Sequence, residues 1–180
     1  MSQSSLLTLV RHLLLVLFCI ISLSAFADEA RLPFGIRAYD IGMAPNFELD
    51  DIDGEHFELN STRGQWVFLH FWASWCGPCR EEMPTIQALS EVIDQEKIHF
   101  VLVNTAENED TVFNFLGVVA PNLSSMLDAS GQVTEVWKPR GLPTTFLIDP
   151  EGRVRYQAIG GREWNQELYL QFIQSLIKPL

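Results

Sequence analysis

Apolar residues gather in short continuous runs that predict the strands of a central sheet. The run Trp66–Trp72 is broken only by His70, and a second run covers residues 98–103. Such runs are typical of strands that are buried on both faces. Thr144–Ile148 predicts a third strand and residues 153–159 predict a fourth. A short turn separates these last two strands, so we expect them to be antiparallel.

Helical periodicity follows the first and the last of these strands. After the first strand, apolar residues recur at spacings of three and four, and this stripe consists of Met83, Ile86, Leu89 and Ile93. Pro84 lies inside this helix and is expected to kink it. A C-terminal helix, ended by Pro179, is predicted by a second stripe that consists of Trp164, Leu168, Phe172 and Leu176. We expect a short helix over residues 110–116 and a connection over residues 121–131.

Two short apolar segments near residue 50 predict a β-hairpin. Residues 47–49 and 56–59 flank a polar turn cluster at residues 50–54. The predicted order of elements is therefore hairpin, β, α, β, α, β, β, α. This order is typical of an α/β fold with a mixed central sheet and helices on both faces.

The first 27 residues have the pattern of a signal peptide. A basic position at Arg11 precedes an apolar run over residues 13–23, and Ala25 and Ala27 provide small residues at a cleavage site. An uncleaved N-terminal membrane anchor is the alternative interpretation, because the apolar stretch is longer when it is counted through to residue 27. Residues 28–40 are predicted to be a tether, and residues 41–180 a single domain.

Charge excludes two classes of partner. The 180 residues carry 12 Lys and Arg against 23 Asp and Glu, a formal net charge of −11. Nucleic acid and anionic lipid both attract basic surfaces, so we expect neither as a partner. Contact with a membrane is expected only if the N-terminal segment is retained.

Cys76 and Cys79 are the candidate reactive groups. They directly follow the first buried strand and open the helix after it, and Cys19 lies in the predicted signal peptide. The positive end of a helix stabilises a thiolate, so we expect Cys76 to attack and the more buried Cys79 to resolve. Gly77 and Pro78 allow a tight first turn. A zinc site, a haem attachment site and an inert disulfide are the alternatives. The chain has no second cysteine pair for zinc, and Arg80 stands directly after Cys79 where haem attachment needs a histidine.

The segment Phe71–Cys79, with its Cys-Gly-Pro-Cys core, resembles the thioredoxin active site, and Arg140–Phe146 resembles the loop that carries the cis-proline of thioredoxin. The signal segment, Ala44-Pro45-x-Phe47 and the run at 142–149 resemble the TlpA/ResA/CcmG-like branch of exported thioredoxin-fold disulfide reductases. The resemblance covers residues 41–178. It implies a thioredoxin fold with an N-terminal β-hairpin and a short helical insertion.

The same resemblance assigns roles to individual residues. It implies a Cys76–Cys79 disulfide in the oxidised protein and a cis Pro143, with Leu142 offering backbone groups to a bound substrate strand. Trp75 is expected to rim the contact surface.

Two further residues are candidates for proton transfer. In this branch of the family, a glutamate at the position of Glu82 lies near the cysteines and tunes proton transfer. A solvated carboxylate on the helix face is the alternative for Glu82. His70 replaces the buried aspartate of thioredoxin, and it is either a second proton relay or a structural histidine.

These observations predict an exported protein-disulfide reductase without metal or cofactor. The resemblance implies exported disulfide-bonded substrates, with apocytochrome c as the leading type, and a membrane electron donor of the DsbD/CcdA kind. The protein is expected in the periplasm, either soluble or tethered to the inner membrane by residues 13–27. A Cu(I)-binding metallochaperone and a peroxiredoxin-like peroxidase are the alternative functions. Neither fits well, because no histidine follows His99 and Ala73 stands three residues before Cys76.

Overall fold

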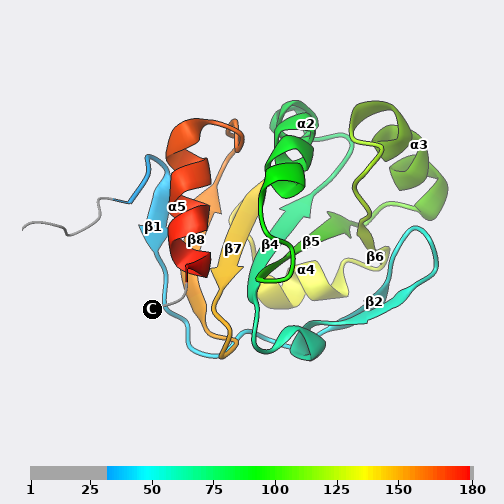
Figure 1. Cartoon of the computed structure of the whole chain (residues 1–180). Coiled ribbons are helices and arrows are strands. Elements are labelled where there is room, and N and C mark those ends of the chain that lie inside the picture. The colour runs from blue at the N-terminus through cyan, green and yellow to red at the C-terminus, as the bar shows by residue number, and fades with distance from the viewer. Residues whose placement is uncertain (1–31, 179–180) are drawn as a thin grey trace, which may run out of the picture. The chain divides into compact units, whose positions relative to one another are not determined.

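The computed structural model describes residues 32–178, which form a six-stranded sheet covered by helices (Figure 1). The predicted signal peptide lies outside the described residues. The strand order is β1-β8-β7-β4-β5-β6. In chain order the strands are β1 (Ile36–Ala38), β4 (Trp66–Trp72), β5 (Ile98–Thr105), β6 (Met126–Asp128), β7 (Thr144–Ile148) and β8 (Val154–Ile159).

The sheet is mixed, as predicted. Strands β4, β5 and β6 run parallel, whereas β7 pairs antiparallel with both β4 and β8, and β1 pairs antiparallel with β8. Strand β4 lies in the interior of the sheet, and every residue from Val67 to Trp72 is buried. This burial explains why its sequence is an almost unbroken apolar run.

Each face of the sheet packs against its own set of elements. On one face, Phe68 and Trp72 contact a core formed with α2 (Gly77–Val92), α3 (Glu109–Val119) and α5 (Glu167–Ile177). On the other face, Leu69 and Phe71 share a second core with α4 (Gln132–Trp137) and the 3-10 helix η2 (Leu59–Thr62). Helices on both faces confirm the predicted α/β class.

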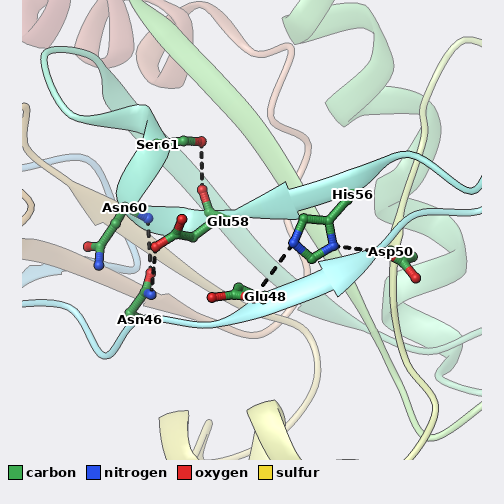
Figure 2. Close-up of polar contacts among 7 residues, drawn as sticks. All are labelled: Asn46, Glu48, Asp50, His56, Glu58, Asn60 and Ser61. Atoms are coloured by element: carbon green, nitrogen blue, oxygen red, sulfur yellow. Dashed lines mark hydrogen bonds and ion pairs between the residues drawn. The ribbon is translucent and has the colours of Figure 1, made fainter.

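The predicted hairpin is present as β2 (Glu48–Asp50) and β3 (His56–Glu58). Figure 2 shows its outer face, where the His56 ring contacts Asp50 at 2.9 Å and Glu48 at 3.6 Å. The hydrogen bond to Asp50 raises the pKa of His56. These groups are solvent-exposed, so the ion pairs contribute little to stability. On its other face the hairpin packs into the second core through Phe47 and Phe57.

Short elements account for most differences between prediction and structure. The predicted tether over residues 28–40 contains β1, which forms the sheet edge against β8. The predicted connection over residues 121–131 contains β6, and α4 was not predicted at all. Strands of three residues and a helix of under two turns are too short to show a hydrophobic period. Helix α3 also extends beyond its predicted range of 110–116.

The C-terminal helix is present, and its predicted apolar stripe is partly confirmed. Phe172 and Leu176 are partly buried and pack against the first core. Leu168 is 41% exposed instead, and the fully packed positions of α5 are Tyr169 and Ile173. Trp164 is fully buried but lies in the loop before the helix. An α-helix has 3.6 residues per turn, so residues spaced four apart move gradually around the helix and do not stay on one face. Trp164 precedes the first residue of α5 and so belongs to no face of that helix.

Candidate active site

Three chain segments meet at one edge of the sheet. Phe71 pairs with Thr144, so the segment that follows β4 and the segment that precedes β7 lie at the same edge. Thr144 also pairs with Ile159, which brings the end of β8 to this edge. The cysteine motif, the predicted cis-proline loop and the loop of Gly160 and Gly161 after β8 therefore come together.

The cysteines lie at the N-terminus of α2 and form the expected disulfide. The Cα atoms of Cys76 and Cys79 are 5.2 Å apart. Cys76 is the N-cap residue, and its Sγ accepts a hydrogen bond from the backbone N–H of Cys79 at 3.3 Å. Cys76 is 6% exposed and Cys79 is fully buried. The more accessible sulfur is thus also the one that the helix N-terminus stabilises as a thiolate.

The Leu142–Pro143 peptide bond is cis, which confirms the prediction. The Pro143 carbonyl accepts a hydrogen bond from Gly160 N–H at 2.9 Å, and this bond ties two of the loops together. Leu142 is partly buried and packs against both cores. Trp75, next to Cys76, is 68% exposed and is available for contact with a partner.

The loop after β8 approaches the first turn of α2 closely. A Cβ atom on Gly161 would lie 3.1 Å from both the Cβ and the carbonyl oxygen of Pro78. This is tighter than an ordinary van der Waals contact, so glycine at position 161 allows the loop to pack on the cysteine motif.

Glu82 is buried beside the cysteine motif, not solvated on the helix face. It is 2% exposed, its Oε1 accepts a hydrogen bond from the indole N–H of Trp164, and its Oε2 has no hydrogen-bond partner. Burial raises the pKa of Glu82 to about 8, against the opposing effects of Trp164 and Arg162. A carboxyl with such a pKa exchanges a proton near neutral pH.

A cavity of about 860 Å³ opens beside this carboxyl. It is bordered by the first turns of α2, the loop after β8, α5 and the N-terminal turn that includes Phe34. Pro78 and Glu82 both line it. The cavity therefore connects the surroundings of the cysteine motif with the buried carboxyl.

His70 is fully buried on β4. Its Nδ1 lies 2.9 Å from the Thr145 hydroxyl, and its Nε2 has no hydrogen-bond partner. Side chains alternate along a strand, so His70 points to the same face as Phe68 and Trp72, the face that α2 covers. Burial, with a smaller contribution from Arg162, lowers the pKa of His70 to about 3. The imidazole is therefore neutral at physiological pH.

Because His70 is buried in its neutral form, we expect the folded protein to lose stability in acid. The folded pKa lies below the ordinary value of 6.5, so stability is present above pH 6.5 and is lost as the pH falls toward 3. We expect His70→Asn to reduce the drop in unfolding free energy between pH 7 and pH 5 by about 2 kcal/mol. Urea unfolding at the two pH values measures this drop. The exposed His99→Asn is the matched control, and an equal drop in wild type and His70→Asn would contradict the expectation.

Sequence reasoning missed three residues that shape the site. Trp164 and Arg162 contact or face Glu82 from a segment 80 or more positions away, and no local pattern reveals this. Glu107 was also missed: its carboxylate accepts hydrogen bonds from the backbone N–H of Ser74 at 2.7 Å and from the Ser74 hydroxyl. It also accepts one from Asn104 Nδ2 at 2.8 Å. Glu107 thereby fastens the loop that leads into Trp75 and Cys76.

No helix within residues 32–178 is both long enough and apolar enough to cross a membrane. In the same described part of the chain, no three His, Cys, Asp or Glu side chains are grouped so that they could hold a metal ion.

Comparison with known proteins places the sequence among disulfide oxidoreductases. The AhpC/TSA family matches residues 42–157. The thiol-disulfide oxidoreductase ResA of Bacillus subtilis is 34% identical over 171 residues, which cover 93% of this chain and 90% of the relative. ResA of Geobacillus thermodenitrificans is 36% identical over 136 residues, which cover 76% of each chain.

Solved structures agree with the fold. A Chlorobium tepidum protein described as a candidate thiol:disulfide interchange protein DsbE superimposes with a TM-score of 0.70 at 31% identity. The match covers 79% of this chain and all of that chain. StoA from Bacillus subtilis gives a TM-score of 0.62 at 27% identity, covering 71% of this chain and 96% of that one.

Proposed function

This chain belongs to the AhpC/TSA family and is a thioredoxin-fold thiol-disulfide oxidoreductase, and from this premise we propose that it is an exported reductant of protein disulfides. The observation that carries the proposal is the position of Cys76. Cys76 caps α2, and its sulfur accepts a hydrogen bond from Cys79 N–H. Cys76 is slightly exposed, whereas Cys79 is fully buried.

The reduction takes place in two exchange steps. The Cys76 thiolate attacks a substrate disulfide, one S–S bond forms as another breaks, and one substrate sulfur leaves as a thiolate. Cys79 then loses its proton and attacks the Cys76 sulfur, which releases the second substrate sulfur. The substrate gains two electrons and two protons, and the Cys76–Cys79 disulfide remains on the enzyme.

Glu82 acts in the second step as the acceptor of the Cys79 proton. Its burial in the same helix and its raised pKa support this role, because a base is most effective when its pKa is near the working pH. Leu142 and the cis Pro143 would align the substrate strand next to Cys76. Trp75 would contact the substrate at the exposed rim.

Export and partners belong to the same proposal. Residues 1–27 act as a signal peptide or anchor that places the protein in the periplasm. A membrane electron donor of the DsbD/CcdA kind returns the enzyme to the dithiol form. Oxidised apocytochrome c is the proposed substrate type, supported by the similarity to the TlpA/ResA/CcmG-like branch.

The midpoint potential of the Cys76–Cys79 couple tests the direction of electron flow. The protein is equilibrated in defined thiol buffers and followed by tryptophan fluorescence, since Trp75 neighbours Cys76. We expect a value at or below about −230 mV, in the range of thioredoxin and glutaredoxin. A value above about −150 mV would indicate a disulfide donor or isomerase and would overturn the reductant proposal.

A further inference from the structure

Arg162 makes both polar and aromatic contacts in the loop that follows β8. Its Nη2 donates hydrogen bonds to the carbonyl oxygens of Ile159 at 3.1 Å and Gly160 at 3.0 Å. Its guanidinium carbon lies 5.1 Å from the ring centroid of Trp164 and 5.7 Å from that of Tyr169. A guanidinium that is hydrogen-bonded and stacked on aromatic rings loses little freedom and keeps its charge in one place.

The N-terminal turn fixes the same guanidinium from another side. Gly35 has a φ of +75°, and a Cβ atom there would lie 2.8 Å from Nη1 of Arg162. The Tyr169 hydroxyl donates to the Phe34 carbonyl at 3.0 Å and so anchors this turn to α5. Glycine therefore suits position 35, because the positive φ strains other residues and a Cβ atom would displace the guanidinium of Arg162.

Arg162 and Glu82 line the same cavity. Trp164 links them, because its ring stacks with Arg162 and its indole N–H donates to Glu82. Arg162 is the positive group among the cavity-lining residues, and its Nε is buried without a hydrogen-bond partner. The other titratable groups around Glu82 are Glu81 on its own helix, Glu163 in the loop, Tyr169 on α5 and His70 on the face of β4 that α2 covers.

The positive charge of Arg162 lowers the pKa of both candidate proton carriers, Glu82 and His70. It favours the carboxylate form of Glu82 and disfavours the imidazolium form of His70. Without this charge, burial would be opposed by hydrogen bonding, chiefly from Trp164, and Glu82 would keep its proton bound over a wider pH range.

We propose that Arg162 is a positioning residue that keeps the buried Glu82 carboxyl able to exchange a proton near neutral pH. This inference rests on the proton-transfer role proposed for Glu82. Its consequence is that the pH range of the enzyme depends on a residue that touches neither the cysteines nor the substrate disulfide.

The experiment replaces Arg162 with glutamine, which retains hydrogen-bond donors but carries no charge. The Glu82 carboxyl is titrated in the oxidised full-length protein by ¹³C NMR, and its signal is assigned from the spectrum of Glu82→Gln. We expect the titration midpoint to rise by about one pH unit from the wild-type value. The rising limb of the pH–rate profile for reduction of a disulfide-bonded peptide is expected to move upward by the same amount.

Three further variants make the result specific. Arg162→Lys restores the charge and is expected to recover most of the shift. Arg153→Met removes an exposed positive charge at the other end of β8 and is expected to leave the midpoint unchanged. Gly35→Ala keeps Arg162 but displaces its guanidinium, so it is expected to raise the midpoint even if Arg162→Gln does not fold.

The outcomes separate this inference from the proposed function. A Glu82 midpoint that stays unchanged in the folded Arg162→Gln protein, or in Gly35→Ala if only that variant folds, overturns the role of Arg162. If Glu82→Gln itself leaves the pH–rate profile unchanged, the proton-transfer role of Glu82 is wrong and the inference about Arg162 falls with it. The disulfide chemistry of Cys76 and Cys79 is tested separately by the midpoint potential.

Discussion

Cys79→Ser is expected to accumulate a stable mixed disulfide between Cys76 and a disulfide-bonded peptide, whereas Cys76→Ser forms none. Cys76 caps α2 and is 6% exposed, so it can reach a substrate, while Cys79 is fully buried beneath it. Without Cys79, no second thiol displaces the substrate from Cys76. Multiple-turnover reduction should fall by roughly 10³-fold or more in either variant, because each removes an essential step. Mass spectrometry of the intact adduct distinguishes the two cases.

One outcome of the adduct experiment would contradict the roles assigned to Cys76 and Cys79. If Cys76→Ser captures the peptide and Cys79→Ser does not, the attacking and resolving roles are reversed. A Cys76→Ser/Cys79→Ser double variant controls for non-covalent binding, since the only other cysteine is Cys19 in the predicted signal peptide.

Glu82→Gln is expected to stabilise the oxidised protein at alkaline pH relative to wild type. The folded pKa of Glu82, about 8, lies above its ordinary value of 4.5. The folded state therefore holds a proton that the unfolded chain has released, and the associated stability is present below pH 4.5 and lost as the pH rises through 8. Between pH 5 and pH 8 this loss amounts to about 3 kcal/mol.

Denaturant unfolding of the oxidised protein at these two pH values measures the effect. The drop in unfolding free energy should be smaller in Glu82→Gln by this amount, because the amide still accepts from Trp164 but does not titrate. Glu81→Gln, at the exposed neighbouring position, is the matched control and should behave like wild type. Identical drops in all three proteins would mean that Glu82 titrates at an ordinary pKa in the folded state.

Features that depend on neighbouring residues in the chain were predictable. The buried run of β4, the position of Cys76 at a strand–helix junction, and the antiparallel β7–β8 pair each follow from a few consecutive residues. Hydrophobic period, helix capping and loop length act over one or two turns of chain, so a sequence displays them directly. The cis Pro143 came from the family resemblance instead, since most X-Pro bonds are trans.

Features that depend on distant segments were not predictable. Strand β1 is too short to identify by pattern and exists because it pairs with β8, some 120 residues later. The sequence marked Trp164 as part of an apolar stripe, but the fold places it in a loop as the hydrogen-bond donor to Glu82.

The sequence by itself therefore determined the chemistry of this protein: a dithiol at a helix N-terminus within an α/β sheet. Only the tertiary structure decided the protonation of the groups that assist it. The pKa values of Glu82 and His70 depend on burial and on the charge of Arg162, which come from elements far apart in the chain. Water exclusion and electrostatic fields are properties of the assembled fold, and no stretch of sequence contains them.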